Sequence, residues 1–312
     1  MAVETPREGR TMRLKSGLLM LIAAVVGMSI AAEAGVRTIN SKSFYPEGPI
    51  WHDGKLFYVE YAKSRVMTWD GKENKEFWKQ DGCGANGLAE IDGDAIIVDC
   101  YDSNTLVEVD RNGKTIKAIS SDSGGNPFLG PNDFCRDARG GLYLSASGVY
   151  DVGAPIQGKV YYIAPDGKIT VVADTIHYAN GLSVMPDGKT LLVAEMLAGR
   201  ILSFPIYADG SLGPRRVWAR LQDITPMTPG ADAYNGPDGV KVGPDGLIYI
   251  AQNGSGRVLV TDQTAKLVRK IDVPAKYVTN VNFGPTVSTL FITAAIDANN
   301  PPYPGEVYEV TP

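Results

Sequence analysis

Four oxygen-bearing side chains stand at similar places in successive segments of this chain. They are Glu47 in PEGPIW, Asn132 in GPNDF, Asn180 in ANGLSV and Asp238 in GPDGVKV. Two carboxylates and two amide carbonyls form an all-oxygen ligand set, which is the type that hard divalent cations prefer. If each segment is one blade of a closed ring, the four side chains converge on its axis. The sequence then predicts a divalent-metal site there.

The spacing of these segments predicts the architecture. Six openings follow one plan, and they are Glu47, Asn86, Asn132, Asn180, Asp238 and Asn280. The steps between them are 39, 46, 48, 58 and 42 residues, and a four-stranded propeller blade takes roughly 40 to 50 residues. Runs rich in Val, Ile, Leu, Tyr and Thr alternate with Asp-Gly, Asn-Gly and Pro-Asp turns, which suit tight hairpins.

We therefore predict an all-β fold, a six-bladed β-propeller with four-stranded blades. One blade needs a strand from the opposite end of the chain to close the ring, because closure removes an exposed sheet edge. Residues 36–43 and residues 306–310 are the two candidates for this role.

The first 34 residues have the pattern of a signal peptide. Four basic residues precede an apolar stretch at 17–30, and Ala32-Glu33-Ala34 provides a small-x-small cleavage site before Gly35. The apolar stretch is shorter than the ~20 residues that span a bilayer. We expect residues 1–34 to be removed on export to a bacterial periplasm or beyond, and residues 35–312 to form a single propeller domain with no membrane attachment. A retained membrane anchor is the alternative.

Charge and cysteine content narrow the function further. Residues 35–312 contain 26 basic and 32 acidic residues and no basic cluster, which argues against nucleic-acid binding. Cys83, Cys100 and Cys135 are expected on one face of the ring, because antiparallel strands return to the face where they began. An oxidising compartment favours one disulfide. The sequence is compatible with two pairings, Cys83 with Cys100 or Cys100 with Cys135.

Several stretches resemble the family of senescence marker protein (regucalcin), gluconolactonase and luciferin-regenerating enzyme. The resemblance covers roughly Phe44 to Val310, and its best stretches are YPEGPIW, GPNDFCRDARGGLYLS, NGLSVMPDGKTLLVAEMLAGRILSFPI and NGPDGVKVGPDGLIYIAQNGSGRV. It implies a six-bladed propeller with one catalytic divalent metal, Ca²⁺ foremost and Mg²⁺, Mn²⁺ or Zn²⁺ as alternatives. Glu47, Asn180 and Asp238 would be ligands. Asn132 would be a further ligand or a substrate contact, and Asp238 the general base.

The chemistry of these residue types agrees with that implication. A cation held by few protein oxygens keeps positions open for a water molecule and a carbonyl oxygen, and Asp238 can accept the proton of that water. Asn86 occupies the same blade position and is either a substrate contact or a turn residue. His177, three residues before Asn180, either reaches the channel mouth or belongs to a loop that connects two blades.

Departures from the family pattern bear on the substrate. Gly130 stands where sugar-lactone members often have an arginine, and Ser145-Ala146-Ser147 stands where an aspartate is common. A less polar lactone or aryl ester is therefore supported as well as gluconolactone. Long segments at 145–155 and 225–235 are expected to cap the metal face and shape the pocket.

Three functions follow from these patterns. The leading hypothesis is a metal-dependent hydrolase of small-molecule lactones or related esters. A phosphotriesterase is the second, because the Glu, Asn, Asn, Asp set also resembles the calcium site of diisopropylfluorophosphatase-like propellers. The third is a non-catalytic exported propeller whose loops bind a partner.

Overall fold

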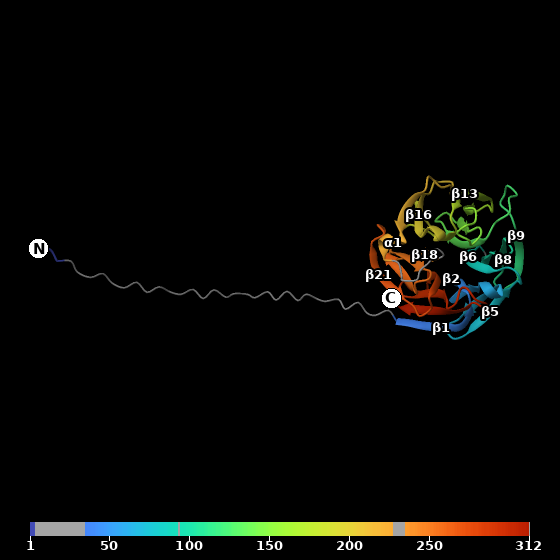
Figure 1. Ribbon diagram of the computed structural model, residues 1–312, viewed down its shortest axis with the longest axis horizontal. Coiled ribbons are helices and arrows are strands. Elements are labelled where there is room, and N and C mark those ends of the chain that lie inside the picture. The colour runs from blue at the N-terminus through green and yellow to red at the C-terminus, as the bar shows by residue number, and fades with distance from the viewer. Residues whose placement is uncertain (4–34, 93, 227–234, 312) are drawn as a thin grey trace. The chain divides into compact units, whose positions relative to one another are not determined.

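The computed structural model describes residues 1–3, 35–92, 94–226 and 235–311. The chain divides into two units, Met1–Ala32 and Glu33–Pro312, and nearly all of the predicted signal peptide lies outside the described residues. The second unit contains six four-stranded sheets that form the blades of a ring (Figure 1). The predicted six-bladed propeller is confirmed. In the part of the chain that the structure describes, no helix has the length and apolar character needed to cross a membrane.

Five blades are antiparallel meanders that follow the chain from the innermost to the outermost strand. The first blade contains β2 (Pro46–His52), β3 (Lys55–Glu60), β4 (Arg65–Trp69) and β5 (Asn74–Lys79). The second contains β6 (Ala85–Ile91), β7 (Ala95–Cys100), β8 (Thr105–Val109) and β9 (Thr115–Ile119). The third is β10 (Pro131–Arg136), β11 (Leu142–Ala146), β12 (Gly158–Ile163), β13 (Ile169–Ile176). The fourth contains β14 (Ala179–Val184), β15 (Thr190–Glu195), β16 (Arg200–Pro205) and β17 (Arg216–Arg220). The fifth contains β18 (Pro237–Val242), β19 (Ile248–Gln252), β20 (Arg257–Thr261) and β21 (Leu267–Asp272).

The sixth blade joins the two ends of the propeller. Its strands are β22 (Tyr277–Phe283), β23 (Leu290–Ala295), β24 (Pro304–Thr311) and, outermost, β1 (Gly35–Phe44). β1 pairs antiparallel with β24, from Gly35 opposite Thr311 to Phe44 opposite Pro304. The N-terminal candidate therefore supplies the closing strand, and the blade no longer exposes the outer edge of β24. Three short helical turns, η1 (Tyr61–Lys63), η2 (Met196–Ala198) and α1 (Leu221–Ile224), connect strands.

Apolar side chains fill the space between neighbouring blades. Tyr249 and Val260 of the fifth blade, for example, share a buried cluster with Val281 and Ile292 of the sixth. A blade packed on both faces needs apolar residues on both sides of its strands, and this explains continuous runs such as Ala95–Cys100, all of which are buried.

Glycines bring the innermost strands close together around the axis. Gly48, Gly87, Gly181 and Gly239 each follow one of the blade openings. A Cβ atom at Gly181 would lie 2.3 Å from the backbone nitrogen of Val240, and one at Gly87 would lie 2.7 Å from the carbonyl oxygen of Asn132. No side chain fits at such distances, so glycine is required where one inner strand passes the next.

The cysteines form one disulfide, between Cys83 and Cys100, and Cys135 is free. The first of the two predicted pairings is therefore observed. The expectation that all three sulfurs lie on one face of the ring is wrong. Cys135 is the fifth of the six residues of β10, the innermost strand of its blade, and so lies near the end of the strand that is farther from the blade opening. Its sulfur accepts a hydrogen bond from the Val184 N–H at 3.2 Å, and burial raises the pKa of the Cys135 thiol to about 11.

The inner-strand glycines lead to a test of the ring geometry. Gly181→Ala should lower Tm by about 2 to 12 °C, since overpacking costs about 1–3 kcal/mol and each kcal/mol shifts Tm by roughly 2–4 °C in a domain of this size. Gly153→Ala is the matched control, because its Cβ would meet only the side chain of Asp151 at 3.4 Å. Equal melting temperatures for the two variants would contradict the close approach.

Candidate active site

Every inner strand has an irregular register beside its opening residue. The shifts fall between Glu47 and Ile50, Ala85 and Gly87, Pro131 and Asp133, Ala179 and Leu182, Pro237 and Val240, and Val278 and Asn280. A β-bulge bends its strand and changes the direction of nearby side chains. Because the bulge recurs in all six blades, residues from distant parts of the sequence meet at the axis.

The two carboxylates of the predicted set are buried near one another. Glu47 and Asp238 are only 4% and 3% exposed. Burial, and after it the charge of Asp238, raises the pKa of Glu47 well above its usual range. Burial also raises the pKa of Asp238 to about 8. A buried pair of like charges needs a proton or a cation to compensate it.

Specific donors hold these two carboxylates. Glu47 Oε2 accepts hydrogen bonds from the Gly48 N–H at 2.9 Å and from Asn280 Nδ2 at 3.2 Å. Asp238 Oδ2 accepts one from Asn253 Nδ2 at 2.9 Å. Each carboxylate is thus oriented through one oxygen.

The two predicted amide ligands, Asn132 and Asn180, are each 4% exposed. Asn180 lies close enough to Asp238 to oppose the rise in the pKa of that carboxyl group, and its Nδ2 lies 3.4 Å from the sulfur of Met196. Among the described residues, neither Asn132 Oδ1 nor Asp238 Oδ1 has a hydrogen-bond donor, although both atoms are buried. Buried oxygens without a partner are rare and costly. They are suitable ligands for a cation.

The remaining predicted residues border this group. Asn86 is a strand residue, not a turn residue, and its Nδ2 donates to the Asn132 carbonyl at 3.0 Å. His177 lies in the connection between β13 and β14, where its N–H donates to Glu195 Oε1 at 2.9 Å. Its Nε2 is buried with no hydrogen-bond partner in the part of the chain that the structure describes. No group of three or more His, Cys, Asp or Glu side chains among the described residues is placed to hold a metal, and the predicted set has only two acids.

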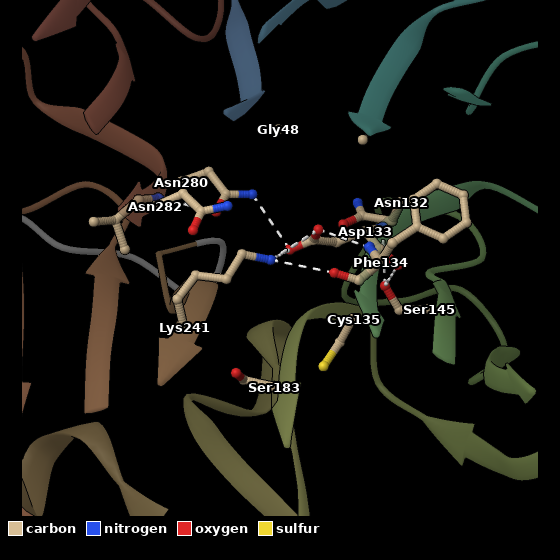
Figure 2. Close-up of polar contacts among 12 residues, drawn as sticks. Gly48, Asn132, Asp133, Phe134, Cys135, Ser145, Ser183, Lys241, Asn280 and Asn282 are labelled. Carbon is tan, nitrogen blue, oxygen red and sulfur yellow. Dashed lines mark hydrogen bonds and ion pairs between the residues drawn. The ribbon is translucent and has the colours of Figure 1, made fainter. Parts of the chain in front are cut away.

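Three residues that the sequence analysis did not assign to the site extend it along the channel (Figure 2). Lys241 Nζ lies 3.1 and 3.0 Å from the two carboxylate oxygens of Asp133, which comes from the third blade. Asn280 Nδ2 donates to Asp133 Oδ2 at 3.3 Å as well as to Glu47. The sequence did contain signals for all three. Asn280 is the sixth blade opening. Asp133 occupies a position where four openings have glycine, and Lys241 interrupts the apolar run GVKV.

Cavities lie toward both ends of the channel. Two cavities of about 230 and 340 Å³ share Tyr45 and Tyr150, and Asn86 lines the first while Asn253 lines the second. Burial and then the charge of Asp238 raise the pKa of Tyr45, which places this tyrosine beside the carboxylates. A third cavity, of about 310 Å³, is lined by Asp133, Lys241 and Cys135.

The two long segments expected to shape the pocket are described in part. Tyr150 brings segment 145–155 to both cavities beside the carboxylates, and Asn235 does the same for segment 225–235 in the larger one. Residues 227–234 lie outside the described residues.

These features define a class of protein, the six-bladed propellers with acids and amides of separate blades gathered on the axis. Within that class, residues 45–296 match the family described as the SMP-30/Gluconolactonase/LRE-like region, and the chain belongs to this family. It is 24% identical to regucalcin of Xenopus laevis over 286 residues, which are 85% of this chain and 90% of that protein. It is 26% identical to lactonase drp35 of Staphylococcus haemolyticus over 260 residues, 80% and 75% of the two chains.

Solved structures agree on the fold. A gluconolactonase of Xanthomonas campestris superimposes with a TM-score of 0.73 at 22% identity, over 89% of each chain. A calcium-binding regucalcin of Agrobacterium tumefaciens has the same TM-score and identity, over 89% of this chain and 95% of its own.

The Asp133–Lys241 pair yields a stability prediction. The Asp133 side chain is 3% exposed and that of Lys241 14%, so Lys241→Met leaves a buried carboxylate without its cation. We expect this variant to lose about 3 kcal/mol of unfolding free energy or more in a denaturant titration. Asp133→Asn in the same background should recover much of the loss. Exposed Lys270 is the control, since Lys270→Met should change stability by less than about 0.5 kcal/mol. A loss under about 1 kcal/mol for Lys241→Met would contradict a buried pair.

Proposed function

We propose that this protein is a metal-dependent hydrolase of lactones or related esters. The observation that carries the proposal is the group of buried oxygens on the axis, in which Asn132 Oδ1 and Asp238 Oδ1 lack donors among the described residues. Family membership supports it, because relatives include proteins named lactonase and gluconolactonase.

Glu47, Asn132, Asn180 and Asp238 would hold one divalent cation. All four residues offer oxygen ligands, and only two of them carry charge. Such a ligand set favours Ca²⁺ or another hard cation, such as Mg²⁺ or Mn²⁺, over soft metals. Burial and neighbouring carboxylates raise the pKa values of Glu47 and Asp238, and a bound cation would stabilise the charged form of both. When bound, the cation would polarise the ester carbonyl and lower the pKa of the attacking water.

Asp238 is suited to act as the general base. Asn253 donates to one lone pair of Oδ2. With Oδ1 as the cation ligand, the second lone pair of Oδ2 can accept a proton from water as the water oxygen bonds to the carbonyl carbon. The bond between that carbon and the ring or alkoxy oxygen then breaks. Asp238 returns the proton to the departing oxygen, so a lactone yields one hydroxy acid. Asn86 and Asn132 would contact the substrate.

Export is part of the proposal. The basic and apolar segments of residues 1–34 and the small-x-small site before Gly35 support a cleaved signal peptide. The Cys83–Cys100 disulfide supports an oxidising compartment such as a periplasm.

A substrate panel tests the function directly. The purified protein is assayed on lactones, aryl esters and phosphotriesters, with and without a chelator. We expect lactone or ester hydrolysis that the chelator abolishes and one added metal restores. Preference for the phosphotriesters would favour the second hypothesis, and no turnover of any substrate would favour the non-catalytic propeller.

Substitutions should separate the base from the ligands. Asp238→Asn keeps a ligand oxygen but removes the proton acceptor, so hydrolysis should fall by about 10²-fold or more while metal still binds, measured by calorimetry. Asn180→Ala should instead weaken metal binding, and excess metal should restore part of the rate. His177→Ala should change the rate less than about tenfold. An inactive His177→Ala protein beside a nearly wild-type Asp238→Asn protein would replace the aspartate mechanism with a histidine mechanism.

A further inference from the structure

Six tyrosines form a continuous arc of rings beside the candidate active site. Each ring contacts the next, and the centroid distances are 6.2 Å for Tyr303–Tyr45, 5.6 Å for Tyr45–Tyr61, 6.2 Å for Tyr61–Tyr101, 6.4 Å for Tyr101–Tyr178 and 4.8 Å for Tyr178–Tyr150. We call these residues the tyrosine arc. All six line the cavity of about 230 Å³, which also contains Asn86.

The arc is assembled from distant parts of the chain. Its residues come from the connections β23–β24, β1–β2, η1, β7–β8, β11–β12 and β13–β14. Four of these lie within the sixth, first, second and third blades, and two link neighbouring blades. The ring of blades is what gathers these six side chains at one mouth of the channel.

The backbone holds half of the arc in an unfavourable conformation. Tyr45, Tyr178 and Tyr303 have φ values of 50°, 65° and 56°, a region where bulky residues are outliers and glycine or asparagine is usual. A turn alone would favour one of those smaller residues. Residues kept in such conformations tend to cluster at binding and catalytic sites, and here all three place an aromatic ring in one cavity.

The arc offers aromatic surface, and two of its hydroxyl groups are bound within the protein. The Tyr61 hydroxyl donates to Asp102 Oδ1 at 2.9 Å, and the Tyr101 hydroxyl donates to the Gly148 carbonyl at 2.8 Å. Among the described residues that line the two cavities beside the carboxylates, none is charged. The polar groups of these cavities are tyrosine hydroxyls and the amides of Asn86, Asn235, Asn253 and Asn299. Charge-assisted hydrogen bonds, which would hold the hydroxyls of a sugar ring most strongly, are therefore not offered by this lining.

We propose that the tyrosine arc binds an aromatic group of the substrate, so that the preferred substrates are aryl-bearing lactones or aryl esters and not sugar lactones. This inference rests on the proposed hydrolase function for its reacting bond. An aromatic group can meet the tyrosines in offset-stacked or edge-to-face contact. The ester group would then lie beside Glu47, Asn132, Asn180 and Asp238, the residues that would hold the cation. Tyrosine rings also attract quaternary ammonium groups. The test must therefore distinguish binding of an aromatic group from binding of a cationic group.

The first arm of the test compares substrates that differ by one group. We expect kcat/KM for δ-phenyl-δ-valerolactone to exceed that for δ-valerolactone by about tenfold or more, and glucono-δ-lactone to be hydrolysed more slowly than either. Faster hydrolysis of glucono-δ-lactone would overturn the inference and leave the proposed function intact. Preference for butyrylcholine over phenyl butyrate would overturn it in favour of a cation site.

The second arm measures binding without hydrolysis. The lactam 6-phenyl-2-piperidinone should bind about tenfold more tightly than 2-piperidinone in calorimetry. Binding of the phenyl lactam by a protein that hydrolyses no lactone or ester would sustain the aromatic subsite and refute the hydrolase function. Equal affinity for the two lactams would overturn the inference itself.

Variants then assign the effect to the arc. Tyr101→Leu keeps apolar volume but removes a ring, and it should lower the preference for the phenyl lactone at least about threefold, mainly through KM. Tyr61→Phe keeps the ring and should retain the preference, which covers the case in which the leucine variant does not fold. Tyr207→Leu, at a tyrosine that is 51% exposed in the β16–β17 connection, is the matched control and should change nothing. An undiminished preference in folded Tyr101→Leu, or a lost one in Tyr61→Phe, would overturn the assignment.

Discussion

The close approach of six inner strands around one axis is the constraint on which the rest of this structure depends. Glycines after four of the openings let neighbouring backbones pass where any Cβ would collide, and β1 closes the ring against β24. The recurring bulges lie in this crowded zone, and they turn one polar side chain of each blade toward its counterparts. Residues nearly two hundred positions apart become neighbours for that reason.

Gathering polar groups on an axis creates an electrostatic problem that the channel resolves differently along its length. Asp133 is compensated within the protein, because Lys241 crosses from the fifth blade to bind it. Glu47 and Asp238 have no lysine or arginine bound among the described residues and are held by amides and an N–H instead. Asn280 joins the two regions by donating to both Glu47 and Asp133. In the candidate metal site, therefore, no lysine or arginine among the described residues compensates the two carboxylates.

The surroundings of this site decide what it can bind. Under the proposed function, the buried carboxylates and amides would act on the ester bond, and the residues that line the two neighbouring cavities would select among ester-like substrates. Here those residues are mostly tyrosines and asparagines, which offer flat rings and neutral amides in place of charged groups. Strained φ values at three tyrosines indicate that these rings are held in place and are not incidental surface residues.

The sequence alone determined the blade number, the inner-strand positions and the identity of the axial residues, because turn chemistry and strand periodicity are local and repeat at every opening. Glu47, Asn86, Asn132, Asn180 and Asp238 could all be read in this way. Only the tertiary structure decided which residues meet. Lys241 reaches Asp133 across the ring, Asn253 holds Asp238, and Cys83 pairs with Cys100 while Cys135 lies apart. The tyrosine arc is the clearest case. Tyr45 and Tyr178 each stand two residues before a blade opening, and Tyr61 and Tyr101 each follow the second strand of a blade, but the six rings become neighbours only when the blades close.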